Sequence, residues 1–332
     1  MPLHEDLELL HALQIAPRAS WRSIGAAIHR SPGVLATRWQ ELTDAGLAWS
    51  TAVPFGSERS GVLVFVALLS ESGRQGELID QAMRIPEVIS VEEPARHWDL
   101  ILTVLAKSFE DFLQRLRPGI LRLEGIARHE TIVCTRLHFS GHEWRLNALS
   151  EEAVRALARQ NPAREASSRV LREEDRELLS ILFRDGRAGV SEISAELGTH
   201  PSTVSRRLNR VLASTGVSLR CDVAPEIIGQ PISCQWFCWL PPEQHAAAAL
   251  ILRTLPNLRL CASTTGQTNF TFVIWVEAPE DIFEIERTVV ERIDHLSISE
   301  SSVTVRFLKR MGWRLDSRGR RSGDPVAPTF LP

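Results

Sequence analysis

A run of hydroxyl and arginine residues between positions 202 and 212 is the part of the sequence best suited to bind an anion. Its apolar residues recur at helical spacing, so its polar side chains share the other face of a helix. A guanidinium can fork onto a phosphate or a guanine edge, and each bidentate base contact discriminates by about 1–3 kcal/mol. The alternative is an arginine-rich face that only meets solvent. The candidate contacts, in a run without acids, are Ser202, Thr203, Ser205, Arg206, Arg207 and Arg210.

Two further helices are predicted to position this run. Leu178 and Leu182 belong to an apolar pattern at helical spacing that ends near Gly186. A short second helix opens at Ser191 and ends at Gly198, and the chain turns before the run begins. Three short helices with a tight turn before the last are typical of a helix-turn-helix that binds double-stranded DNA.

The chain is predicted to contain two copies of one module. Asp6 and Asp175 stand 169 positions apart within similar segments, LHEDLELLHAL and LREEDRELLSIL. Farther along, the offset becomes 170, as between Asp99 and Asn269. One added residue over so long a span is what a duplication leaves behind, so each half should fold in the same way.

The first copy of the DNA-contacting helix is chemically poorer. It offers Thr37, Arg38 and Gln40 as candidate contacts, but Gly33 replaces a hydroxyl residue and Glu41 adds an acid. This first head could bind a different half-site, bind weakly, or serve only as structure. Because two unequal fused heads do not require a palindrome, we expect an asymmetric operator.

Each copy continues into segments that alternate in the order strand, helix, strand, strand, helix, strand, which is the order of a ferredoxin-like unit. Helices cover only one face of such a sheet, so we expect the open faces of the two sheets to pack together. The segments are 62–69, 76–84, 88–93, 100–106, 109–116 and 131–139 in the first copy, and 232–240, 243–254, 258–264, 269–276, 279–293 and 302–308 in the second.

Together these motifs resemble the Lrp/AsnC (feast/famine) family of transcriptional regulators. The resemblance rests on LREEDRELLSILFRDGR, SEISAELGTHPSTVSRRLNRV, VAPEIIG and TGQTNFTFVIWV in the second copy, and on WDLILTVLA in the first. It implies a DNA-binding regulator, with this chain similar to a family dimer fused head to tail. It also implies an amino acid or related small-molecule effector at the sensor units, and a homo-oligomer.

The predicted fold class is α+β, with two helix-turn-helix (winged-helix-like) domains and two ferredoxin-like βαββαβ sensor domains in tandem duplication. The predicted parts are a first helix-turn-helix at 1–50, a first sensor at 60–145, a linker at 146–170, a second helix-turn-helix at 171–220, a second sensor at 230–310 and a basic, Pro-rich tail at 311–332.

The resemblance also implies where an effector would bind, at the turn before the third sensor strand. A glycine there permits close backbone approach, and amide and hydroxyl groups supply hydrogen bonds. The alternatives are a tight hairpin turn and polar residues that only pair strand ends. The candidates are Thr265, Gly266, Gln267, Thr268 and Asn269 in the second copy, and Arg96, His97 and Asp99 in the first.

One enzyme class resembles this architecture as well. Sirohaem decarboxylases look like Lrp/AsnC proteins, occur as fused pairs and use His and Arg side chains on a tetrapyrrole's carboxylates, which Arg96 and His97 could match. Against this alternative, the second helix-turn-helix keeps its polar, basic face, and the common catalytic motifs are absent from the sequence. We therefore predict no enzyme, no cofactor and no metal site. A sensor or assembly protein with vestigial DNA heads is a further alternative.

Composition places the chain among ordinary globular proteins. It has a net charge of −3, and its five cysteines lack a CxxC pair, which indicates buried thiols rather than a metal site. We expect a cytoplasmic protein without a membrane span, because the start is acidic and long apolar runs are missing. Seven basic residues between 306 and 321 could contact phosphates or form a solvated end.

Overall fold

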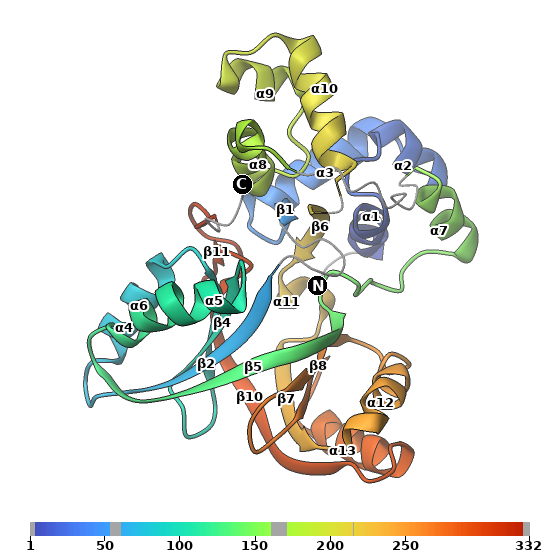
Figure 1. The fold of residues 1–332 in the computed structure, drawn as a ribbon. Helices are drawn as coiled ribbons and strands as arrows, with labels where there is room; N and C mark the ends of the chain where they lie inside the picture. Colours follow the sequence, from blue (N-terminus) through green and yellow to red (C-terminus); the bar gives the residue numbers. More distant parts are fainter. Residues whose placement is uncertain (1–3, 54–60, 161–170, 215, 328–332) are drawn as a thin grey trace. The chain divides into compact units, whose positions relative to one another are not determined.

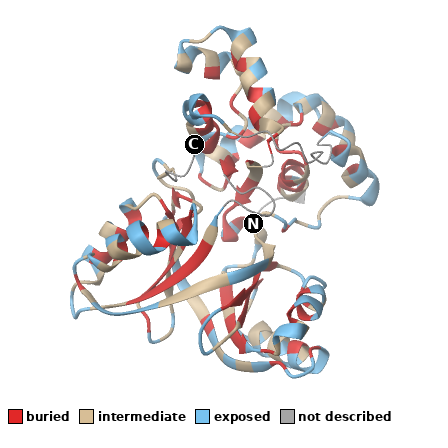
Figure 2. Cartoon of the chain, viewed as in Figure 1, coloured by how far each residue is buried: buried red, intermediate tan, exposed pale blue. Residues whose placement is uncertain are grey.

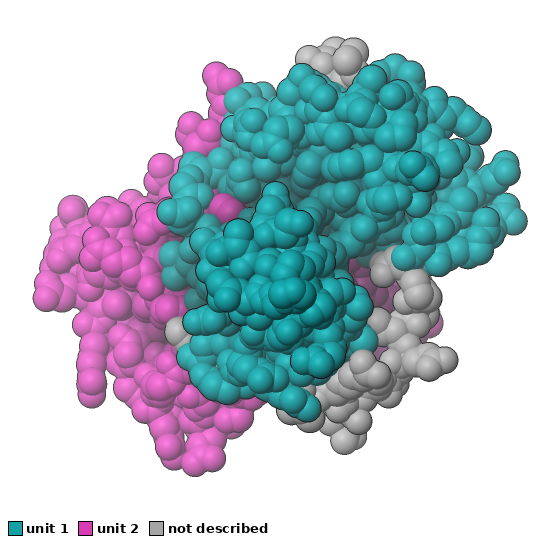
Figure 3. Space-filling model, turned by 90° about the horizontal axis from the view of Figure 1, so that it is seen from above, with its two compact units in different colours: residues 1–60, 145–228, 320–332 teal, residues 61–144, 229–319 magenta. Residues whose placement is uncertain are grey.

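The computed structural model describes residues 4–53, 61–160, 171–214 and 216–327. The chain divides into two compact units (Figure 3). The head unit contains residues 1–60, 145–228 and 320–332, and the sheet unit contains residues 61–144 and 229–319. Each unit therefore combines equivalent parts of both halves of the chain. Of the predicted linker at 146–170, the part at 161–170 lies outside the described residues.

The head unit holds two copies of a three-helix motif followed by a strand (Figure 1). A proline occupies the first position of the third helix in each copy. Proline is tolerated there because a backbone N–H at this position would have no acceptor within the helix. The first copy comprises α1 His4–Ile15, α2 Trp21–Ile28, α3 Pro32–Asp44 and β1 Ala48–Val53. The second comprises the 3-10 turn η2 Glu173–Asp175, α8 Arg176–Arg184, α9 Val190–Leu197, α10 Pro201–Leu212 and β6 Ser218–Val223. The unit also contains α7 Glu151–Ala158 and α11 Pro225–Ile228.

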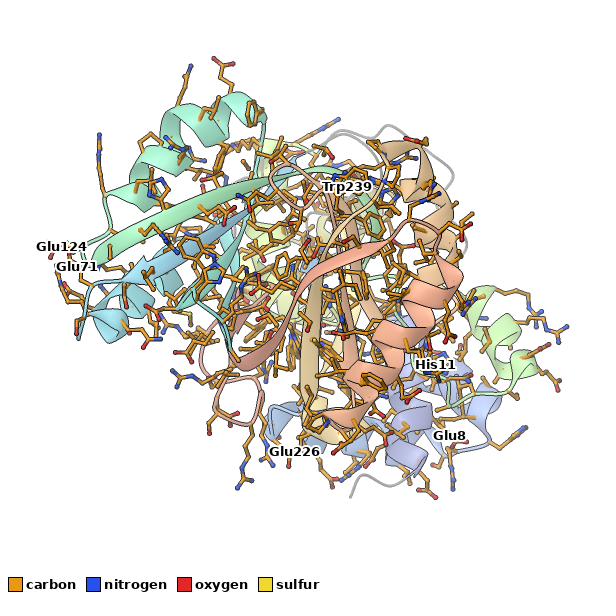
Figure 4. The ribbon with its side chains drawn as sticks, turned by 90° about the horizontal axis from the view of Figure 1, so that it is seen from below. Glu8, His11, Glu71, Glu124, Glu226 and Trp239 are labelled. Carbon is orange, nitrogen blue, oxygen red and sulfur yellow. The ribbon has the colours of Figure 1, made fainter. Side chains whose placement is uncertain are left out.

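The segment after the first sensor is held against α1 by two side chains. His11, labelled in Figure 4, accepts hydrogen bonds at Nδ1 from the backbone N–H groups of Ala148 and Leu149, both at 3.2 Å. Gln14 accepts another from the N–H of Leu146 at 2.7 Å. Burial, helped by the charge of Arg145, lowers the pKa of His11 to about 4. The neutral imidazole is therefore the form that accepts these bonds.

The sheet unit contains two βαββαβ copies, and the α+β prediction is confirmed. Buried residues concentrate on the strands, while the outer faces of the helices are exposed (Figure 2). The first copy comprises β2 Val62–Ser70, α4 Gln75–Arg84, β3 Val88–Pro94, β4 Leu100–Ala106, α5 Phe109–Asp111, the π-helical turn η1 Phe112–Leu116, α6 Arg117–Leu121 and β5 Ile126–Ser140. The second comprises β7 Ile232–Trp239, η3 Pro242–Gln244, α12 His245–Leu252, β8 Leu258–Thr264, β9 Phe270–Val276, α13 Glu280–Arg292, β10 Ser297–Arg310 and the short β11 Trp313–Arg314.

The open faces of the two sheets meet, as expected, and the two sheets are in addition joined edge to edge. The last strand of each copy is much longer than predicted, because it pairs first within its own copy and then with the other. β5 pairs with β2 and then with β8, and β10 pairs with β7 and then with β3. The strands have the order β11-β10-β3-β4-β2-β5-β8-β9-β7, and pairing of β7 with β10 closes the eight strands from β10 to β7 into a ring, while β11 pairs with β10 alone.

Alternate residues of each strand face opposite sides of this ring. On β2, Val64 and Val66 belong to the core under the helices of the first copy. On β7, Cys234 and Cys238 belong to the equivalent core of the second copy, and burial raises the pKa of both thiols to about 12. The residues between them face the other side, where the two copies meet. Among the described residues, no helix is both long and apolar enough to cross a membrane.

Candidate nucleic-acid interface and ligand cavity

The second helix-turn-helix packs its three helices around a small apolar core. Leu178 and Leu182 of α8, Ile193 of α9, and Val204 and Leu208 of α10 are buried together. Gly198 adopts the left-handed conformation, with φ of 57°, and ends α9 where the chain turns toward α10. His200 then accepts a hydrogen bond from the N–H of Ser202 and caps α10. This core holds one face of α10 inward and leaves the other face toward solvent.

The exposed face of α10 carries hydroxyl, amide and guanidinium groups. Ser202, Arg206 and Asn209 are exposed, and Thr203 and Ser205 are half-buried beside them. Among the described residues, Arg206 has no ion-pair partner. Its guanidinium is therefore available to a phosphate or a base edge, as the sequence predicted for this position.

Two of the predicted DNA contacts instead hold α10 in place. Arg210 donates to Glu174 at 2.8 Å and to the buried Asp175 at 2.5 Å. Arg207 donates to the backbone carbonyl of Glu174 and lies near Asp175. Both arginines are only 16–22% exposed. Their charges are thus partly used within the domain, and sequence reasoning missed this role because the acid lies more than thirty positions away in the chain.

The first helix-turn-helix contains the same internal ion pair but a different outer face. Arg38, the equivalent of Arg207, donates to both oxygens of the buried Asp6, at 2.6 and 2.8 Å. Thr37 is exposed, and Gln40 is exposed but donates to Asp44 at 2.8 Å. Of the three predicted contacts in this head, Arg38 therefore has an internal partner, and the exposed face lacks a free cation among the described residues.

The two heads are joined symmetrically within the head unit. β1 and β6 pair antiparallel, with Ala48 opposite Val223 and Val53 opposite Ser218. Arg18 donates to the carbonyls of Gly186 and Ala188, at 2.6 and 2.8 Å. Its equivalent Arg187 donates in return to the carbonyls of Pro17 and Ala19. This exchange fixes α3 and α10 within one compact unit.

The basic residues near the end of the chain do not form one free surface. Arg306 donates to Glu93, and Arg320 donates to both oxygens of Glu226 at 2.8 Å. Lys309 is fully buried and donates to the carbonyls of Met83 and Ile85. Arg321 pairs with Gly46 through its N–H at 2.8 Å and with Thr43 through its side chain. These four side chains have partners within the chain, so the alternative of a solvated end does not describe them.

A cavity of about 250 Å³ lies in the sheet unit on the side of the strands away from the helices. The strand residues that line it alternate with the core residues, as Phe65 and Ala67 do on β2 and Gln235 and Phe237 do on β7. Most of the lining residues pair across the repeat at the 170-residue offset. The pairs are Phe65 with Gln235, Ala67 with Phe237, Arg96 with Gly266, His97 with Gln267, Trp98 with Thr268, Ile101 with Thr271 and Glu130 with Glu300.

Most of the predicted effector residues reach this cavity from both copies. Arg96 and His97 line it from the first copy, and residues 265–268 line it from the second. Arg96 forms an ion pair with Glu300 and stacks on Phe237, with 4.3 Å from its Cζ to the ring centroid. Burial lowers the pKa of Arg96, while the charges of Glu300 and Glu130 oppose that shift. The cavity thus contains a guanidinium whose charge already has a partner.

Asp99 and Asn269 hold strand ends instead of lining the cavity. Asp99 accepts hydrogen bonds from the N–H of Ser70 at 2.8 Å and from its hydroxyl at 2.5 Å. Asn269 accepts from the N–H of Leu240 at 2.9 Å and donates to its carbonyl at 2.8 Å. Asp99 is equivalent to Asn269, and Ser70 to Leu240, at the 170-residue offset. Asp99 and Asn269 therefore pair strand ends, which was one of the alternatives given for them.

Some known proteins resemble part of this chain, and others resemble nearly all of it. The AsnC-type helix-turn-helix domain matches residues 173–211. The HTH-type transcriptional regulator FL11 of Pyrococcus furiosus is 19% identical over 135 residues, which are 40% of this chain and 89% of that regulator. An uncharacterized HTH-type transcriptional regulator of Pyrococcus abyssi is 27% identical over 147 residues, which are 43% of this chain and 90% of that one. A whole regulator thus corresponds to about two fifths of this chain, as a duplication predicts.

A solved structure resembles nearly the whole chain. The crystal structure of the siroheme decarboxylase NirDL matches with a TM-score of 0.59 over 93% of both chains, at 13% identity. That protein is an enzyme, which contradicts the prediction of no enzyme, because the tandem fold itself does not separate regulators from enzymes. The tandem fold class is confirmed. The predicted resemblance to the Lrp/AsnC regulators is confirmed as well, and the chain carries an AsnC-type helix-turn-helix domain.

Proposed function

We propose that this chain is a sequence-specific transcriptional regulator that contacts DNA through α10 and responds to a small effector in the cavity of the sheet unit. The proposal rests on the two different roles of the polar side chains of α10. Arg207 and Arg210 fix the helix to its domain, while Ser202, Arg206 and Asn209 remain exposed on a helix of AsnC type. A fixed helix with a polar, cationic face is what base recognition in the major groove requires.

A genome-wide selection of DNA fragments by the full-length protein tests this function. The affinity for the selected DNA is then compared between wild type and Arg206→Ala at two salt concentrations. We expect the variant to lose about tenfold to a hundredfold in affinity, since a bidentate base contact contributes roughly 1–3 kcal/mol. Arg155→Ala, which removes an exposed arginine from α7 of the same unit, is the matched control and should bind like wild type. Recovery of no sequence-specific DNA would overturn the proposal.

Tetrapyrrole binding is a second candidate, supported by the whole-chain likeness to a siroheme decarboxylase and by Arg96 and His97 in the cavity. The charge and size of the cavity fit this candidate poorly. Glu130 and Glu300 would repel a polycarboxylate, and about 250 Å³ is below the roughly 300–1,000 Å³ common for ligand pockets. Added sirohaem tests the candidate: a saturable absorbance change that Arg96→Ala abolishes, followed by loss of a substrate carboxylate, would favour the enzyme.

A further inference from the structure

The two acids of the cavity occupy equivalent positions but have different partners. Glu130 on β5 and Glu300 on β10 are 170 positions apart and both line the cavity. Arg96 of the first copy neutralises Glu300 of the second through an ion pair. The position equivalent to Arg96 in the second copy is Gly266, which has no side chain to offer Glu130. Among the described residues, the carboxylate of Glu130 has no hydrogen bond or ion pair to a side chain, although the charge of Arg96 also acts on it.

The space beside Gly266 is open. A Cβ placed on this residue would meet only the carbonyl oxygen of Thr268 within 4 Å, at 3.8 Å. Thr265, Gln267 and Thr268 add hydroxyl and amide groups on the same side of the cavity. The cavity therefore has a guanidinium paired with Glu300 and no equivalent cation paired with Glu130 among the described residues.

The remaining lining suits a compact apolar body. Phe65, Ala67 and Ile101 of the first copy and Phe237 of the second line the cavity together with Ile132. Among the arginine and acidic side chains of the lining, one guanidinium, that of Arg96, stands against two carboxylates, those of Glu130 and Glu300, which leaves an excess of one negative charge. A ligand that brings a positive charge would remove this excess, whereas a carboxylate would add to it.

We infer that the cavity binds one small amphipathic cation per chain, with its ammonium or guanidinium group beside Glu130 in the place equivalent to that of the Arg96 guanidinium beside Glu300. Its apolar body lies against Phe65, Ile101 and Ile132. Because the two walls are unequal, the ligand has a single orientation even though the cavity lies where two equivalent copies meet. The inference deepens the proposed function, in which this ligand is the effector.

Calorimetric titration of the full-length protein with matched probes tests the charge preference. Two sets share a skeleton and differ only in their charged groups: 3-methylbutylamine, leucine and 4-methylpentanoate, and 2-phenylethylamine, phenylalanine and 3-phenylpropionate. In at least one set we expect the amine to bind most tightly, the amino acid less so and the acid least, at one ligand per chain. Preference for the acid, or no saturable binding in either set, would overturn the inference.

Three variants locate the cation. Glu130→Gln should weaken amine binding by about tenfold or more, because it removes a charge-assisted hydrogen bond. Glu152→Gln makes the same charge change on the exposed side of α7 and should leave binding unchanged. Arg96→Met should keep or strengthen amine binding, since it frees Glu300. Unchanged amine binding in Glu130→Gln, or loss of amine binding in Arg96→Met, would place the ligand elsewhere.

The same protein samples separate this inference from the proposed function. If the ligand inference fails, the acid or neither probe binds while selected DNA still binds through α10. If the proposed function fails, no specific DNA is recovered, whatever the titrations give.

Discussion

The two heads share an internal anchor and differ in their outer chemistry. Arg38 on Asp6 and Arg207 on Asp175 fix the third helix of each head to the start of its first helix. On the outer faces, however, Thr37 stands where the second head has Arg206. The other differences on these faces are Gly33 for Ser202, Val34 for Thr203, Ala36 for Ser205 and Gln40 for Asn209. The Asp–Arg anchor is thus present in both heads, while among the described residues of α3 and α10 the exposed arginine without an ion-pair partner is Arg206 on α10.

The cavity of the sheet unit shows the same kind of difference. The equivalent strands β5 and β10 bring Glu130 and Glu300 to equivalent places at the cavity, but Arg96 forms an ion pair with Glu300 and not with Glu130. In a symmetric dimer of identical chains the two places would be the same. Fusion of unequal copies therefore permits one ligand in one orientation, and one head that dominates DNA binding.

The largest expected effect is on the shared anchor. Asp175→Ala should destabilise the protein by about 3–5 kcal/mol, because it removes the buried acceptor of Arg210 and of the Arg172 N–H and leaves the largely buried Arg207 without an acid, although Arg210 keeps Glu174. Asp6→Ala should cost less, since Arg38 is 40% exposed and keeps Glu41 as a partner. Urea unfolding measures both. Equal losses, or a loss below 1 kcal/mol for Asp175→Ala, would contradict the anchoring role.

Protonation of His11 should lower the free energy of unfolding at acidic pH. The second head has no matching contribution at this position, because the equivalent residue is Ser180. The pKa of His11 is about 4 in the folded chain and 6.5 ordinarily, so the unfolded chain takes up the proton first. Its contribution is full above pH 6.5 and is lost as the pH falls toward 4, by on the order of 3 kcal/mol. Urea midpoints between pH 7 and 4.5 should fall less steeply in His11→Ser than in wild type. Parallel profiles would show that His11 does not carry this dependence.

Among the described residues, the end of the chain packs against Gly46 of the first head, and substitution of two equivalent glycines tests this contact. Gly46 has φ of +67°, and an added Cβ would lie 2.4 Å from the carbonyl oxygen of Arg321. Gly46→Ala should therefore cost about 1–3 kcal/mol. An added Cβ on the equivalent Gly216 would meet side-chain atoms alone, Leu171 Cδ1 at 3.3 Å and Ser214 Oγ at 3.4 Å, so Gly216→Ala should change the free energy of unfolding by less than about 1 kcal/mol. A larger loss of stability in Gly216→Ala than in Gly46→Ala would mean that Arg321 does not pack against Gly46.

The smallest expected difference lies between the exchanged arginines. Arg187 stacks on Trp21 at 4.1 Å in addition to its two carbonyl bonds, while the residue equivalent to Trp21 beside Arg18 is Val190. Arg187→Lys should therefore be less stable than Arg18→Lys by about 1 kcal/mol. Thermal unfolding of both variants checks the order. If Trp21→Val removes the difference, the stacking contact is its cause.

Local patterns predicted most of the fold. Helical spacing around Leu178 and the alternation on the strands locate the elements, because both periodicities follow from burial of one face. The N-terminal parts of β5 and β10, at 126–130 and 297–301, were not predictable in this way, since their side chains are mostly exposed and show no apolar alternation. The second halves, which overlap the predicted segments, pair with the other copy. The closed ring depends on those long-range pairings, which no local pattern contains.

The candidate sites were predictable only in part. The sequence places Arg206 on an exposed face, but it does not distinguish this residue from Arg207, whose acceptor at Glu174 is distant in the chain. In the sheet unit the turn residues predicted a ligand site, whereas Glu130 and Glu300 were missed. The 170-residue offset that relates these two acids was the available signal, and the identity of their partners required the structure.

The claim that α10 dominates DNA recognition is tested most directly by guanine-methylation interference on the selected operator. Methylation at N7 blocks major-groove contacts, so interfering guanines mark the bases that a recognition helix touches. We expect strong interference in one half-site only, and its loss at specific guanines in Arg206→Ala but not in Thr37→Ala. Equal interference in two half-sites about one helical turn apart, with both variants weakening their own half-site, would show that the two heads contribute alike.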